Sequence, residues 1–120
     1  MSHKVMSGKA RIFLGAVLGL VACTFAGASF GAVDAVAAKK LARKESCLRC
    51  HAVDKKKEGP SYQSVAYKYK GQSDALDKLV AHIETGEKVK LSDGHMEDHK
   101  IVKTKDAEQI KNLISWILAQ

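Results

Sequence analysis

Proline, cysteine and arginine are scarce in this sequence of 120 residues. Pro60 is the only proline, and the chain has no internal repeat, low-complexity tract or Pro-rich linker, which favours one compact domain. Of the three cysteines, Cys23 lies in an uncharged amino-terminal segment, so the rest of the chain offers a single cysteine pair and few ligands for zinc. Its basic residues are mostly scattered lysines without an arginine-rich block, which makes nucleic acid the least expected partner.

The amino-terminal segment is typical of an exported protein. Residues 1–11 carry three basic side chains and no acidic one, and residues 12–33 carry no charge. A basic start, an apolar stretch and small residues at the end form the layout of a signal peptide, and residues 35–37 (Ala-Val-Ala) fit its cleavage site. We therefore predict a signal peptide over residues 1–38 and a mature domain over residues 39–120. That domain is expected in the periplasm or on the outer side of the cytoplasmic membrane.

Two other interpretations of this segment leave the protein attached to a membrane. The uncharged run is about as long as the ~20 residues that cross a bilayer, so it could persist as an anchor. Residues 20–23 also resemble a lipoprotein box, in which Cys23 would carry the lipid. Neither interpretation changes the side of the membrane on which the mature domain lies.

The mature domain would be small and basic. Residues 39–120 contain 17 Lys and Arg against 12 Asp and Glu, a net charge of +5. So small a domain buries little apolar surface, and such domains usually recruit a disulfide, a metal or a cofactor. Its charge suits an acidic protein partner or an anionic membrane, and we expect a monomer.

The mature domain is predicted to be all-α, with three or four short helices. The candidates are residues 39–46, residues 61–70, a helix capped by Ser73 and ending at Gly86, and a last helix capped by Thr104. The third and fourth have apolar residues at helical spacing, namely Leu76, Leu79, Val80 and Ile83, then Ile110, Leu113, Ile114, Ile117 and Leu118. Residues 87–102 lack this periodicity and are predicted to form a long loop, which in a small domain is either functional or disordered.

The motif that carries chemistry is Cys47-Leu48-Arg49-Cys50-His51. This C-x-x-C-H pattern is the attachment signature of c-type haem, because its two thiols can reach both vinyl groups of one porphyrin edge. His51 is then the proximal iron ligand. A thioredoxin-type redox pair would normally follow a β-strand, and the residues before Cys47 show no strand pattern. A plain disulfide across this turn would be strained. We predict one haem c, bonded to Cys47 and Cys50.

Residues 47–71 resemble the haem-binding half of short bacterial class I cytochromes c. The matching features are the C-x-x-C-H motif, the Ala-Val-Asp that follows it, a lysine loop, Gly59-Pro60 and a tyrosine-rich helix. The resemblance implies a class I cytochrome c fold, in which the first and last helices cross. It also implies that the Pro60 carbonyl accepts a hydrogen bond from His51, which fixes the orientation of the imidazole. The implied function is electron transfer between redox proteins, with no substrate transformed.

The sixth iron ligand is expected in the loop before the last helix. In the family that ligand is a methionine, and Met96 lies at the matching place, 45 residues after His51. The loop nevertheless departs from the family pattern, since His95 and His99 flank Met96 in a charged stretch. Ligation by His99 or His95, or no stable sixth ligand, therefore remain alternatives, whereas His82 is assigned no role.

Two other functions follow from these alternatives. A labile sixth position would suit a haem protein that binds a small ligand, and the domain could also be the electron-carrying subunit of a larger redox enzyme. For the electron carrier, the lysines at positions 55–57 could dock an acidic partner, because short-lived redox encounters rely on electrostatic steering.

Overall fold

The computed structural model describes residues 31–120, which contain four α-helices, one short 3-10 helix and one β-hairpin. In chain order these elements are α1 (Ala35–Lys44), η1 (Cys47–Arg49), α2 (Tyr62–Tyr69), α3 (Ala75–Thr85), β1 (Lys88–Lys90), β2 (Met96–Asp98) and α4 (Ala107–Leu118). The prediction of an all-α domain is thus confirmed, apart from the hairpin. Cys23 and the uncharged run before residue 31 lie outside the described residues.

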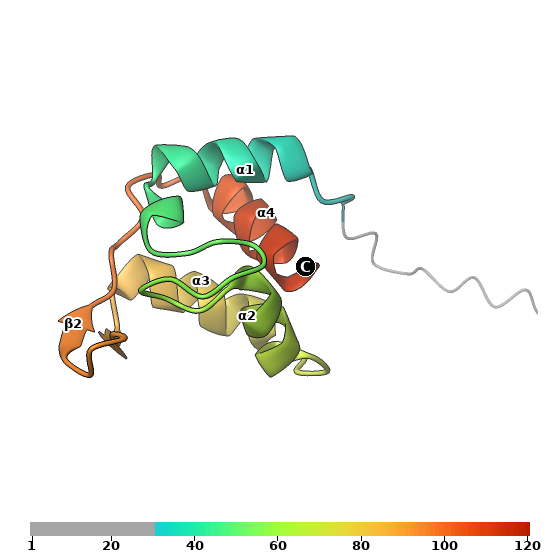
Figure 1. Cartoon of the computed structure of the whole chain (residues 1–120). Helices are drawn as coiled ribbons and strands as arrows, with labels where there is room; N and C mark the ends of the chain where they lie inside the picture. Colours follow the sequence, from blue (N-terminus) through green and yellow to red (C-terminus); the bar gives the residue numbers. More distant parts are fainter. Residues whose placement is uncertain (1–30) are drawn as a thin grey trace, which may run out of the picture. The chain divides into compact units, whose positions relative to one another are not determined.

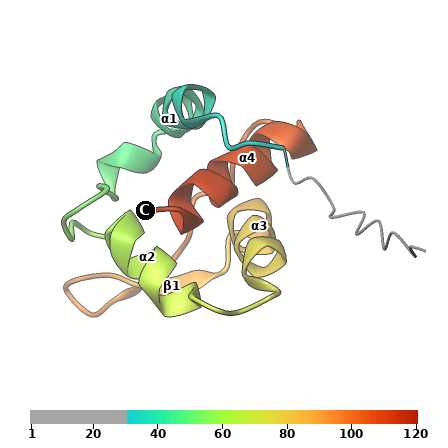
Figure 2. The same ribbon diagram turned by 90° about the vertical axis from the view of Figure 1, so that its right-hand side faces the viewer.

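The first and last helices cross at the centre of the domain. Figure 1 shows α1 along one edge of the fold with α4 passing beneath it, and Figure 2 shows α4 lying between α1 and the pair α2 and α3. Ala38 and Ala42 of α1 are 1% and 0% exposed, so two small side chains let the helices approach closely. The apolar stripe of α4 fills the other side of the contact, with Ile110, Leu113, Ile114 and Ile117 all buried.

The start of α1 is fixed by hydrogen bonds from two directions. The Asp34 side chain caps the helix by accepting from the Ala37 amide at 2.9 Å. Asn112 of α4 accepts from the Asp34 amide and donates to the Asp34 carbonyl, each at 2.9 Å. Asp34 thus ties the start of α1 to α4, and the predicted boundary between Ala38 and Lys39 falls inside α1.

Helix boundaries follow local signals, with three shifts from the prediction, the first being α1, which spans Ala35–Lys44 instead of residues 39–46. Ser61 caps α2 and Gly86 ends α3 with φ of +72°, a conformation that glycine adopts without strain. The third helix begins after Asp74 instead of Ser73. The cap of α4 is Asp106, whose side chain accepts from two backbone amides of the first turn.

The segment predicted as a long loop contains a short antiparallel hairpin. Its strands pair Lys88 with Asp98, and Lys90 with Met96, and the Lys88 Nζ lies 2.8 Å from the Asp98 carboxylate. The strands have only three residues each, too few to show an alternating pattern in the sequence, and the cross-strand charge pair Lys88–Asp98 supports them. Gly94 turns the chain between them, with φ of +93°.

No helix among residues 31–120 is long and apolar enough to cross a membrane.

Candidate functional site

The C-x-x-C-H motif forms a tight turn directly after α1. Ser46 has a φ of +62°, uncommon for a residue with a side chain, and it redirects the backbone into η1. The Cys47 carbonyl then accepts from the amides of Cys50 and His51, at 3.2 and 3.0 Å. This turn places both thiols and the imidazole along the wall of one cavity.

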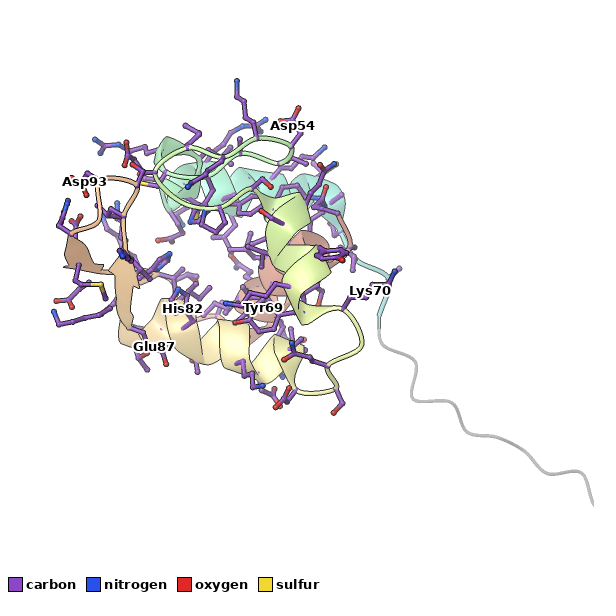
Figure 3. All side chains as sticks on the ribbon, turned by 60° about the horizontal axis from the view of Figure 1, so that its bottom comes forward. Asp54, Tyr69, Lys70, His82, Glu87 and Asp93 are labelled. Carbon is purple, nitrogen blue, oxygen red and sulfur yellow. The ribbon has the colours of Figure 1, made fainter. Side chains whose placement is uncertain are left out.

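That cavity has a volume of about 500 Å³, within the usual range of ligand sites. Its walls come from most of the described chain after α1: the motif, α2, α3, the hairpin, the segment after it, and α4. In Figure 3, Tyr69 of α2 and His82 of α3 face this region, whereas Asp93 lies out on the turn of the hairpin. Much of the lining is aliphatic, from Leu79, Ile83, Val102, Leu113, Ile114 and Ile117.

His51 is held in one orientation by its neighbours. Its Nδ1 donates to the Pro60 carbonyl at 2.7 Å, the hydrogen bond that the family resemblance implied. The Tyr62 ring stacks on the imidazole with centroids 5.5 Å apart and planes 20° from parallel. On another side, a Cβ at Gly59 would overlap the ring, so only glycine fits there. With Nδ1 occupied, Nε2 is the nitrogen left to bind a metal.

A second histidine, His99, lies across from His51. The two ring centroids are 6.1 Å apart. A metal lies about 2 Å from an imidazole nitrogen, and roughly 1 Å separates that nitrogen from the ring centre, so two imidazoles on opposite sides of one metal have centres about 6 Å apart. His99 also uses Nδ1 to donate to a backbone carbonyl, that of Lys100 at 3.0 Å, which leaves its Nε2 as the ligating nitrogen.

The electrostatic surroundings of His99 favour a neutral ring. Burial lowers its pKa below the usual value for histidine, and the charges of His82 and then His51 act in the same direction. A neutral imidazole is the form that binds a metal.

Met96 and His95 are not brought to this cavity. Met96 is 55% exposed on the hairpin and is absent from the cavity lining. His95 is exposed as well, and its Nδ1 contacts the Asp93 carboxylate at 2.5 Å. Of the candidate site residues, the structure thus brings together Cys47, Cys50, His51, Pro60 and His99.

Two further residues of the site were missed by the sequence reasoning. His82 lines the cavity, with its ring centroid 4.5 Å from that of His99 and its Nδ1 3.1 Å from the Glu87 carboxylate. Glu45, only 4% exposed, lies on the cavity wall beside Cys47. Helical spacing could have found both, because His82 follows Leu79 by three residues and Glu45 follows Ala38 by seven.

These features fit a haem better than a bare metal ion. Among residues 31–120, no group of three or more His, Cys, Asp or Glu side chains could hold a metal on its own. A haem iron needs only two axial ligands from the protein, and an aliphatic cavity suits the porphyrin. The buried hydroxyl of Tyr62 has no hydrogen-bond partner within the described chain, as expected where a polar group of a cofactor belongs.

A helical domain with crossed terminal helices, a C-x-x-C-H turn and an apolar cavity defines the class I cytochromes c, which attach haem covalently. The sequence pattern named cytochrome c matches residues 35–120 of this chain. The chain therefore belongs to the cytochrome c family, and it carries one haem c bonded through its cysteines, Cys47 and Cys50. The related cytochromes c are electron carriers.

Individual relatives agree with this assignment. The chain is 35% identical over 109 residues to cytochrome c-552 of Hydrogenobacter thermophilus. The aligned region covers 91% of this chain and 96% of that relative. It is 38% identical over 87 residues to cytochrome c-551 of Allochromatium vinosum, with 72% and 89% covered. The crystal structure of the class 1 cytochrome MtoD from Sideroxydans lithotrophicus matches with a TM-score of 0.71 and 55% identity, over 73% of this chain and 97% of that one.

Proposed function

We propose that the protein is a periplasmic monohaem cytochrome c that passes single electrons between redox proteins, with His51 and His99 as its two axial ligands. The observation that carries the ligand assignment is the pair of imidazoles, with centroids 6.1 Å apart, that line the same cavity as Cys47 and Cys50. His99 thus replaces Met96, the ligand expected from the family pattern. The exposed position of Met96 supports this choice.

When bound, haem c supplies one-electron chemistry at its iron. The chain's own residues hold and tune that group. The Pro60 and Lys100 carbonyls each accept from one imidazole Nδ1, so Nε2 is the nitrogen that each ring has left to bind iron. The aliphatic lining excludes water, and burial raises the pKa of the Tyr62 hydroxyl well above its usual range, so that group remains a hydrogen-bond donor. Two imidazole ligands, in place of an imidazole and a thioether, favour a lower reduction potential.

The partners are proposed to be redox proteins with acidic docking surfaces. Lys68, Lys90 and Lys100 come from three separate segments and all line the cavity. In the lysine loop, Lys55 and Lys56 are exposed, while the Lys57 Nζ donates to the Leu48 carbonyl at 2.6 Å. The three cavity-lining lysines place positive charge where electrons would enter and leave, which suits brief, electrostatically steered encounters. The location outside the cytoplasmic membrane rests on the basic and uncharged amino-terminal segments.

The ligand assignment is tested by visible spectra of the ferric holoprotein. We expect a low-spin spectrum without the charge-transfer band of sulfur ligation, unchanged in Met96→Leu. His99→Ala should give a high-spin spectrum, because the sixth position then loses its side chain. His95→Ala is the matched control, since it removes an exposed histidine four residues away and should leave the spectrum unchanged.

Two results would contradict the proposal. A sulfur charge-transfer band that disappears in Met96→Leu would assign the ligand to Met96. A high-spin spectrum of the unmutated protein would instead support a haem protein that binds a small ligand at an open sixth position.

A further inference from the structure

Glu45 is the one charged residue that is buried within residues 31–120. It is 4% exposed, at the end of α1 and two residues before Cys47, and it lines the cavity. Its place costs stability in two ways: a carboxylate loses hydration on burial, and it lies at the negative end of the α1 dipole. A group retained in so unfavourable a place calls for an explanation beyond packing.

The carboxylate is hydrogen-bonded but not neutralised. One oxygen accepts from the Lys103 amide at 2.8 Å, and the other from the Thr104 amide at 3.3 Å. No Lys, Arg or His nitrogen of the described chain lies within ion-pair distance of it. The carboxylate therefore lines the cavity without a basic partner within ion-pair distance.

The Glu45 carboxylate affects Cys47, one of the two cysteines to which haem is attached. Burial is the larger cause that raises the pKa of the Cys47 thiol, and the Glu45 charge raises it further. Lys100 acts on the same thiol with the opposite sign and a smaller effect.

We propose that Glu45 sets the reduction potential of the haem by holding an unpaired negative charge beside it. This inference rests on the proposed function, since it requires haem at Cys47 and Cys50. A fixed negative charge in a poorly hydrated wall stabilises the oxidised iron, which carries one more positive charge than the reduced iron. Glu45 therefore lowers the midpoint potential and helps to determine which redox proteins can reduce this one.

Glu45 also has a structural role that must be separated from this electrostatic one. Its two hydrogen bonds fasten the end of α1 to the segment between His99 and α4. Two substitutions divide the roles. Glu45→Gln removes the charge and keeps one oxygen, which can accept from the Lys103 amide while the longer Thr104 hydrogen bond is lost. Glu45→Asp keeps the charge on a shorter side chain that reaches both amides poorly.

The experiment is a redox titration of holoprotein variants, together with denaturant unfolding. We expect Glu45→Gln to raise the midpoint potential with the modest loss of stability that one hydrogen bond accounts for. Glu45→Asp should lose more stability while its potential stays at the unmutated value. Glu84→Gln, which removes an exposed carboxylate on α3, is the matched control and should leave the potential unchanged. An unshifted potential in folded Glu45→Gln overturns the inference.

The remaining outcomes also decide the question. If Glu45→Gln does not accumulate as holoprotein, Glu45→Asp alone tests the inference. A raised midpoint potential in Glu45→Asp, which retains the charge, would contradict an electrostatic role. Failure of the proposed function has a different signature: the unmutated protein would then lack covalent haem or a reversible one-electron transition. Covalent haem with a potential insensitive to Glu45 rejects this inference only.

Discussion

A chain shortened to begin at Lys39 is expected to be less stable than one that begins at Val33. The shorter chain loses the Asp34 cap, worth about 1 kcal/mol. It also loses the two hydrogen bonds between Asp34 and Asn112, which are exposed and worth about 0.5–1 kcal/mol each. The expected deficit is about 2–3 kcal/mol, a large part of the stability of so small a domain.

Denaturant unfolding of both chains with haem attached measures this deficit. Substituting Asn112→Ala in both chains tests the cause, because the two changes form a double-mutant cycle. In the longer chain, the substitution should cost about 1–2 kcal/mol, the value of two exposed hydrogen bonds. In the shorter chain it should cost little, because the partner is already gone. Equal costs in the two chains would refute the role given to Asp34.

The same hydrogen bonds bear on where a signal peptide is removed. Cleavage after Ala38 would cut within α1, downstream of its cap and of a residue that is 1% exposed. We therefore propose that the mature protein retains Asp34. The mass of the purified mature protein gives its first residue, and it also reports whether lipid and one haem are attached.

Three further substitutions test other parts of the fold. Gly59→Ala should displace His51, because the added Cβ overlaps the imidazole, and perturbed ferric spectra with lower stability would be its signature. Ile114→Ala in the core should cost about 2–5 kcal/mol on denaturant unfolding, whereas Ile101→Ala, at 48% exposure, should cost far less. Backbone hydrogen bonds at the start of α4 lower the pKa of Asp106 below its usual value of 3.8. The ionised Asp106 cap therefore stabilises the fold above pH 3.8, and this stabilisation is lost as the pH falls through the lower folded-state pKa. Asp106→Asn should therefore flatten the loss of stability between pH 5 and pH 3, and an unchanged slope would count against the cap.

Local patterns were sufficient for the motif and for the core of α4. The C-x-x-C-H sequence is contiguous, so its chemistry could be predicted without the fold, and Ile110, Leu113, Ile114 and Ile117 follow one helical stripe. The hydrogen bond from His51 to Pro60 was predicted from a family resemblance and is present. These features depend on residues that are close in the sequence.

Features that depend on distant residues could not be predicted in the same way. The hairpin places Met96 on an exposed strand and carries the chain onward so that His99, three residues later, reaches the cavity. Nothing in the local sequence separates these two residues as ligands, because both are soft or borderline donors in one charged stretch. Helical spacing places Glu45 on the buried face of α1, but its hydrogen-bond partners at Lys103 and Thr104 lie 58 and 59 residues away and could not be predicted locally.

The proposals for His99 and Glu45 act on the iron in the same direction. A second imidazole in place of a thioether removes the ligand that favours reduced iron. An unpaired carboxylate beside Cys47 stabilises oxidised iron through its field. The two residues belong to different segments and make no hydrogen bond to each other, so their effects can be separated by substitution. Approximate additivity of the two potential shifts in the double variant His99→Met with Glu45→Gln would show that this chain lowers its potential in two independent ways.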